Sequence, residues 1–204
     1  MRCRSFARLA AFAMLAAVLA GGSSVRAAED DVYSKRMFGS NFGKQDKSYA
    51  CFVRRYDAAH LAKHPLQKVN TMALLITAET DAEDKTVNYS FRLGLKFRSR
   101  PGNFDSSGSC GHASASQVSA DKLHLGCGVD CDGGGISAEL SNGDKSTLIR
   151  LDAIRIWNNN KPDDEGFSLS GGADDRVFRL DRANAEQCQS LVTDRKELAA
   201  MRTK

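Results

Sequence analysis

The sequence lacks the short motifs by which many enzymes are recognised. It has no G-x-S-x-G nucleophile elbow, no P-loop and no G-x-G-x-x-G dinucleotide-binding turn. It also has no internal repeat of about 20 to 50 residues and no low-complexity tract beyond small Gly and Ser clusters. These absences argue against a repeat architecture and give no support to catalysis. We therefore predict no cofactor and favour a non-catalytic protein.

Long apolar runs are also missing. The one apolar run, Leu9–Ala20, is shorter than the roughly 20 residues that span a bilayer. Three arginines precede it, and small residues ending in Val25-Arg26-Ala27 follow it. This pattern predicts a secretory signal peptide over residues 1–27, the alternative being an uncleaved N-terminal anchor. We expect an exported protein, periplasmic or secreted, with no membrane span after cleavage.

A net charge is absent once the predicted signal is set aside. The chain has 29 Lys and Arg residues against 25 Asp and Glu residues. Four of the basic residues, Arg2, Arg4, Arg8 and Arg26, lie in the signal, so residues 28–204 carry 25 charges of each sign. Nucleic-acid binding usually needs a basic footprint. We therefore predict no nucleic-acid partner.

Hydrophobic alternation predicts an all-β, mainly antiparallel domain. The strongest pattern is Val87–Phe97, where apolar residues alternate with polar or small ones over eleven residues. A change of phase near Asp152-Ala153 predicts a bulge in a later strand. Helix-length crossovers between strands are missing, which argues against a parallel sheet. We predict a single barrel or sandwich of about eight strands with a short C-terminal helix near residues 185–199. This β-rich domain spans residues 49–204 and follows an N-terminal arm, residues 28–48.

Five cysteines remain after the predicted cleavage, and outside the cytoplasm they are expected to pair. A tight turn at Ala120-Asp121 would place Cys110 opposite Cys131, whereas a slightly longer turn would bring Cys127 there instead. We predict a Cys51–Cys188 bridge and a Cys110–Cys131 bridge, with Cys127 free in the core.

Two histidine pairs are candidates for metal chemistry. His60 and His64 have the i, i+4 spacing of zinc ligands on a helix. Pro65 favours a non-helical conformation at His64, so the two imidazoles need not share a face. His112 and His124 would be neighbours if the hairpin between them forms. With nearby acids they would make a metal-dependent or acid/base site, which is our second alternative function.

A line of basic residues follows the polar face of the long strand. It comprises Arg92, Lys96, Arg98 and Arg100. Such a line is a possible contact for an anion or a partner, such as an acidic protein, a lipid headgroup or a surface polysaccharide. The alternative is a solvated face that protects a sheet edge.

The composition and the predicted export together favour a binding role. We predict non-catalytic binding of a small apolar ligand inside a barrel, or of an envelope protein or other envelope partner through the arm and the basic strand face. The first alternative is a secreted inhibitor or accessory subunit that acts by protein contact.

The predicted cleavage is tested by mass spectrometry of the protein purified from its own host. We expect the intact mass to fall short of the full chain by the mass of residues 1–27, because the segment ending at Ala27 matches a cleavage site. A full-length mass would instead support the uncleaved anchor.

Overall fold

The computed structural model describes residues 32–39, 42–43, 45–112, 124–161 and 165–202. The predicted signal peptide and the turn at residues 120–121 lie outside these ranges. The strands are β1 (Lys47–Arg55), β2 (Val69–Thr80), β3 (Val87–Phe97), β4 (Phe104–His112), β5 (His124–Gly128), β6 (Gly134–Ser141), β7 (Ser146–Asn158), β8 (Phe167–Ser170) and β9 (Val177–Ala183). The helices are α2 (Ala58–Lys63), the 3-10 helix η3 (Ala185–Leu191) and α3 (Arg195–Arg202).

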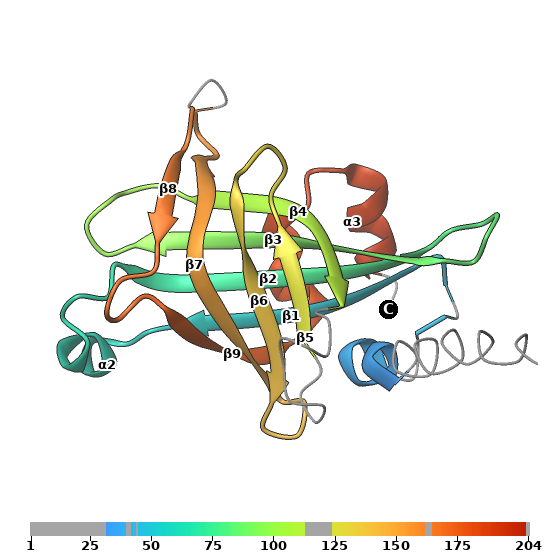
Figure 1. Cartoon of the computed structure of the whole chain (residues 1–204), viewed down its shortest axis with the longest axis horizontal. Helices are drawn as coiled ribbons and strands as arrows, with labels where there is room; N and C mark the ends of the chain where they lie inside the picture. The colour runs from blue at the N-terminus through green and yellow to red at the C-terminus, as the bar shows by residue number, and fades with distance from the viewer. Residues whose placement is uncertain (1–31, 40–41, 44, 113–123, 162–164, 203–204) are drawn as a thin grey trace, which may run out of the picture.

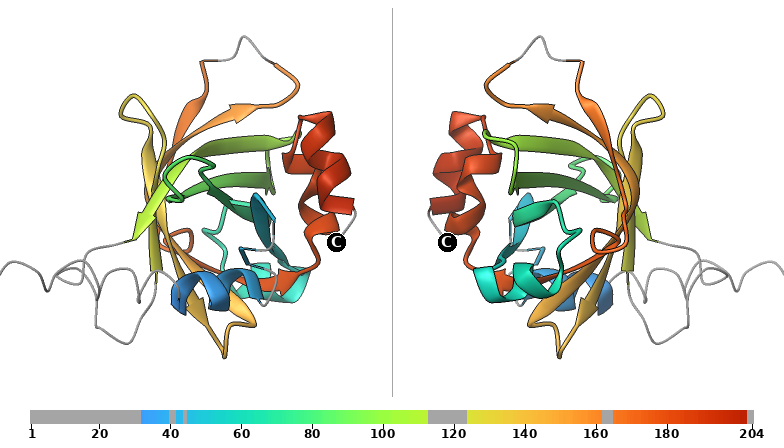
Figure 2. Two further views of the ribbon diagram at one scale, coloured as in Figure 1. Left: turned by 90° about the vertical axis from the view of Figure 1, so that its right-hand side faces the viewer. Right: turned by 90° about the vertical axis from the view of Figure 1, so that its left-hand side faces the viewer.

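The strands form one antiparallel sheet that closes on itself. From β1 to β6 each strand pairs with the next, β6 pairs with β7, β7 with β9, and β9 returns to β1. Strand β8 lies outside this closed ring and pairs with the second half of β7. Figure 1 shows the ring from the side and Figure 2 shows it from its ends. The predicted antiparallel β-fold with a short C-terminal helix is therefore confirmed, and the strands close into a ring instead of separating into two sheets.

The segments with alternating apolar and polar residues form strands, because one face of each strand packs in the interior of the ring and the other lies on its outside. Strand β3 has the bounds that the sequence pattern indicates, and it pairs with β2 along its whole length. In β7 the predicted bulge is present: Ile136 pairs with Leu151 and Gly135 with Ala153, which leaves Asp152 as the extra residue. The bulge lets both apolar phases of β7 face the same interior.

The interior of the ring is filled by large side chains. Phe52, Phe91 and Phe178 are fully or almost fully buried, as are leucines and isoleucines from β2, β3, β5 and β7. Phe97, Phe104 and Phe167 contact one another near one end, with ring centroids 5.1 to 6.0 Å apart. These side chains make the interior of the ring the main hydrophobic core.

Residues 32–38 form a helix that packs against the core of the ring (Figure 2). Its Tyr33 and Met37 side chains are fully buried. Burial raises the pKa of the Tyr33 phenol, and the nearby Tyr89 raises it further by a smaller amount. The Arg182 guanidinium lies 4.8 Å from the Phe52 ring centroid and donates to the carbonyl of Met37 at 2.7 Å. Arg182 thus ties the C-terminal end of this helix to the sheet.

A second, smaller core lies on the outside of the ring. Here η3 and α3 cover the outer faces of β1 and β2, burying Leu75, Val192 and Met201. The predicted continuous helix over residues 185–199 is wrong, because η3 ends at Leu191 and α3 begins at Arg195. Leu191 packs onto β3 at Gly94, where a Cβ would lie 2.5 Å from the leucine Cδ2. The missing side chain at Gly94 lets η3 approach the sheet.

The helices of the described residues are all short. In α2 the Asp57 side chain accepts a hydrogen bond from the backbone N–H of His60 at 2.7 Å, as expected for an N-cap. Helix α3 has eight residues. Within the described part of the chain, no helix is long and apolar enough to cross a membrane.

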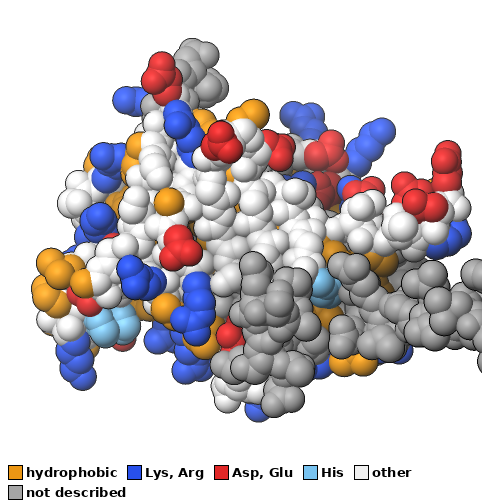
Figure 3. All heavy atoms as spheres, viewed as in Figure 1, with side chains coloured by type: hydrophobic (Ala, Val, Ile, Leu, Met, Phe, Trp, Pro, Cys, Tyr) orange, Lys and Arg blue, Asp and Glu red, His pale blue; other side chains and the backbone are white. Residues whose placement is uncertain are grey.

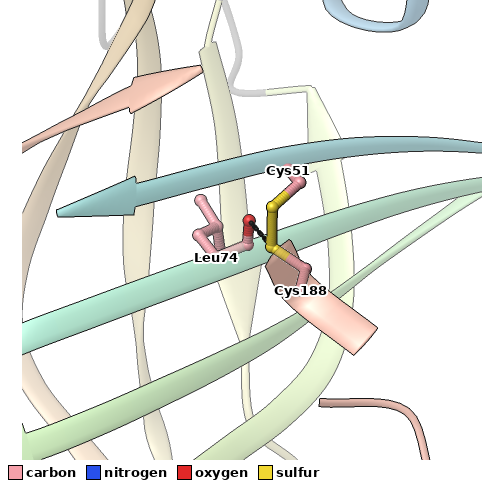
Figure 4. Close-up of a disulfide and its surroundings, with 3 residues drawn as sticks. All are labelled: Cys51, Leu74 and Cys188. Atoms are coloured by element: carbon pink, nitrogen blue, oxygen red, sulfur yellow. Dashed lines mark hydrogen bonds between the residues drawn. A yellow bond between two sulfur atoms is a disulfide. The ribbon is translucent and has the colours of Figure 1, made fainter. Parts of the chain in front are cut away.

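The Cys51–Cys188 disulfide joins β1 to η3 (Figure 4). Both cysteines are buried in the outer core, and their Cα atoms lie 5.9 Å apart. The bridge closes a loop between residues 137 positions apart in the sequence. It therefore fastens the end of the chain to the first strand.

The second bridge joins Cys110 to Cys127, so the prediction of a Cys110–Cys131 bridge is wrong. Strand β5 ends at Gly128, and the register of β4 and β5 places Cys110 directly opposite Cys127. Cys131 lies beyond the strand in the turn before β6 and is exposed, with a free thiol and a positive φ of 56°. The register corresponds to the longer of the two turns considered above.

Removal of each bridge should lower stability, and the loss should be larger for the longer loop because it grows with the logarithm of loop length. In the chain-entropy relation, the Cys51→Ser/Cys188→Ser variant loses about 5 kcal/mol and the Cys110→Ser/Cys127→Ser variant about 3 kcal/mol. Urea unfolding measures both, in a Cys131→Ser background that prevents disulfide exchange. Equal losses, or a larger loss for the shorter loop, would contradict this expectation.

Candidate functional site

Two of the four predicted contact residues are engaged inside the protein. Arg92 forms a bidentate pair with Glu197 of α3, with N–O distances of 2.8 and 2.9 Å. Arg98 donates to backbone carbonyls of the loop at residues 64–67, at 3.3 to 3.5 Å. These contacts fasten α3 and the α2–β2 loop to the ring. Both guanidiniums are thus already occupied.

The other two differ from each other. The Arg100 guanidinium lies over the Phe167 ring, 4.1 Å from its centroid, and near Phe104. Lys96 is exposed on the outer face of β3, and no ion pair to it is found among the described residues. Of the predicted line, Lys96 is the cation that remains open to a ligand.

Lys96 lines a groove of about 550 Å³ on the outer surface of the ring. In β1, β2 and β3 every second residue faces the interior, and the residues between them face outward and make the floor of the groove. Helix η3 makes one wall. The start of β4 and Asn159 complete it. The groove therefore belongs to the outer surface, apart from the packed interior.

The groove is cationic. Its lining includes Arg54, Arg55 and Lys96 but no acidic side chain of the described residues. Arg54 is paired with Asp181 at 2.6 Å, whereas Arg55 is exposed and, within the described ranges, has no ion pair. Arg55 is opposite Thr71 on β2, and Thr71 is opposite Lys96 on β3. Arg55 and Lys96 thus lie about 10 Å apart across the groove, at about 4.8 Å per strand.

Uncharged polar groups surround these cations. The lining contains five hydroxyl or amide side chains: Thr71, Asn103, Asn159, Gln187 and Ser190. Asp105 is opposite Gly94 in the register and borders the groove. Burial raises the pKa of Asp105, and a hydrogen bond from Asn159 opposes that rise. The groove offers hydrogen-bond donors and acceptors around two open cations.

His112 and His124 do not come together. The His112 ring contacts Tyr33 and Tyr89, at centroid distances of 4.9 and 5.3 Å, on the inner side of β4. His112 is opposite Leu125, which is fully buried in the interior, so the adjacent His124 projects to the outer face of β5. The two imidazoles therefore lie on opposite faces of the sheet.

The His60 and His64 rings do share a face, with centroids 4.3 Å apart. His64 is the C-cap of α2 and lies outside helical geometry, and the rings stack nonetheless. His60 contacts Gln67 at 3.0 Å, and His64 lies 3.7 Å from a carboxylate oxygen of Asp174. Across the described ranges, no group of three or more His, Cys, Asp or Glu residues is arranged to hold a metal ion.

The charged side chains are unevenly distributed over the outer surface. The outer positions of β4, β5 and β6 carry mostly Ser and Gly, and Figure 3 shows an uncharged area at the centre of that face. Lys and Arg side chains gather toward the side where β7 and β9 lie (Figure 3). A basic region therefore exists in a chain that has no net charge after residue 27.

Sequence reasoning identified Lys96 but missed Arg55 and the wall formed by η3. The Arg54-Arg55 doublet at the end of the first strand was the available signal. Its significance depends on the pairing of three strands, which the sequence does not specify.

The two kinds of basic residue should differ in their effect on stability. Arg98→Ser removes three contacts to carbonyls and should cost about 1 to 3 kcal/mol, whereas Lys96→Ser should change stability by less than about 0.5 kcal/mol. Urea unfolding of both variants measures the difference. A large loss in Lys96→Ser would assign this lysine a structural role.

Comparison of the chain with protein-family models, with curated proteins and with solved structures gives no match. The function is therefore inferred from the residues of this chain and their geometry.

Proposed function

We propose that the protein is an exported, non-catalytic binding protein that holds an anionic, hydroxyl-rich ligand in the groove between Arg55 and Lys96. One observation carries this proposal: two exposed cations, which have no acidic partner among the described residues, face the same groove. Hydrogen bonds to charged groups are the stronger ones in proteins, so such cations favour a ligand carboxylate. The hydroxyl and amide side chains around them suit ligand hydroxyls.

Export is supported by the predicted signal and by the two disulfides, since disulfides persist in oxidising compartments. The periplasm and the extracellular space are both compatible with them. In either place the groove would meet soluble or surface-bound ligands.

The outer groove has more support than an apolar ligand inside the ring. Phenylalanine, leucine and isoleucine side chains fill the interior, whereas a buried ligand needs a cavity of a few hundred Å³. The second pocket, about 400 Å³ beside α3, also lies outside the ring.

An inhibitor acting by protein contact has less support. Such a protein usually presents a contiguous apolar patch. In the described ranges, the exposed large hydrophobic residues are Val32, Leu66 and Val177, which come from three separate segments. Three exposed apolar side chains offer little area for a contact of this kind.

The groove proposal is tested with galacturonate, a sugar acid, against galactose, its neutral counterpart. We expect galacturonate to bind with a Kd near 1 mM, about 4 kcal/mol, and galactose to bind far more weakly. NMR titration measures the affinity and locates the perturbed residues. Arg55→Ser and Lys96→Ser should each weaken galacturonate binding about tenfold, the effect of one charge-assisted hydrogen bond.

Arg202→Ser is the matched control, because it removes an exposed positive charge from α3. This variant should bind galacturonate like the parent protein. Equal affinity for galactose, or unchanged binding in both groove variants, would overturn the proposal.

A further inference from the structure

A second pair of cations flanks the groove. Arg54 and Arg179 both bind the carboxylate of Asp181, at 2.6 and 2.9 Å. One carboxylate therefore serves two guanidiniums. Arg55 lies beside Arg54 in the lining of the groove and has no ion pair of its own among the described residues.

The register places Arg179 next to the groove. Val53 of β1 pairs with Asp181 of β9, and continuing this antiparallel register by two residues sets Arg55 opposite Arg179. The Tyr56 hydroxyl donates to the Arg179 carbonyl at 3.3 Å, which links the residue that follows β1 to β9. Arg179 thus extends the outer surface on which Arg55 lies.

The cations consequently form a row across the strands. Thr71 of β2 lies between Arg55 of β1 and Lys96 of β3, and Arg179 of β9 joins this transverse row when the β1–β9 register is extended by two residues beyond Val53 and Asp181. With neighbouring strands about 4.8 Å apart, the row is about 14 Å long. It offers two subsites that can each bind an anion. One lies in the groove at Arg55 and Lys96, and the other lies at Arg179.

A row of this kind suits a ligand with repeated charges. Each additional carboxylate of a linear chain adds an interaction within the same complex, so its effective concentration at the second subsite is high. The uncharged groups beside the row, Thr71 and Ser190 among them, match hydroxyls between the charges. Among the described residues, the exposed large hydrophobic side chains are Val32, Leu66 and Val177, whereas insertion into a membrane needs a broad apolar face.

We propose that this row binds a linear carboxylated glycan of at least two sugar acids, an inference that rests on the proposed function of the groove. The first sugar acid occupies the groove between Arg55 and Lys96. The next one lies toward Arg179, where the shared Asp181 leaves an excess of positive charge.

The test compares trigalacturonate with galacturonate on the full chain carrying its native N-terminal segment. Isothermal titration calorimetry should give at least about tenfold tighter binding of the trisaccharide, and this gain should shrink as the ionic strength rises. Arg179→Ser should remove the gain and leave galacturonate binding unchanged. Arg55→Ser and Lys96→Ser should weaken both ligands. The Arg195→Ser/Arg202→Ser control removes two exposed positive charges from α3 and should change neither.

The outcomes separate the two proposals. If galacturonate binds in the groove and trigalacturonate binds no tighter, or keeps its gain in Arg179→Ser, the glycan chain is overturned and the groove stands. If trigalacturonate binds with no dependence on Arg55 or Lys96, the groove proposal is overturned. Hexaglutamate or phosphatidylglycerol vesicles that bind tighter than trigalacturonate, with the same dependence on the variants, would overturn the glycan in favour of an acidic peptide or a membrane.

Discussion

The Cys51–Cys188 disulfide is the constraint on which the outer surface depends. Helix η3 is a seven-residue 3-10 segment whose N-cap makes no side-chain hydrogen bond, and short helices of this kind are marginal without tertiary support. The bridge holds it against β1, and Leu191 settles over Gly94 of β3. Since η3 is a wall of the groove, the Cys51–Cys188 disulfide helps to hold the groove in shape.

The closed ring explains why a groove exists on the outside. The inward side chains of this ring pack together as the main core, so the interior contributes stability. The outward side chains of the same strands are then free to differ from place to place. On β1 to β3 they divide between an apolar part covered by η3 and α3 and a cationic part beside it. The main core and the candidate site thus lie on opposite faces of the same strands.

The parts that could be predicted are those determined by local pattern. Alternation alone located β3 with its correct bounds, and the reversed phase in β7 located its bulge. The partner of Cys110 could not be predicted, because it depends on the register set by the turn between β4 and β5. The same limit applies to the groove. Lys96 and Arg55 are far apart in the sequence and become neighbours only through two strand pairings.

The neutrality of residues 28–204 does not conflict with an anionic ligand. Electrostatic interactions between exposed charges are screened beyond about 8 Å at physiological ionic strength, so a ligand experiences the charges around its site and not the net charge of the chain. Around the groove, Asp181 pairs with Arg54 and also with Arg179, Asp105 borders the groove, and Arg55 and Lys96 have no ion pair among the described residues. Local imbalance of this kind gives a compact cationic site without the broad basic surface that nucleic-acid binding requires.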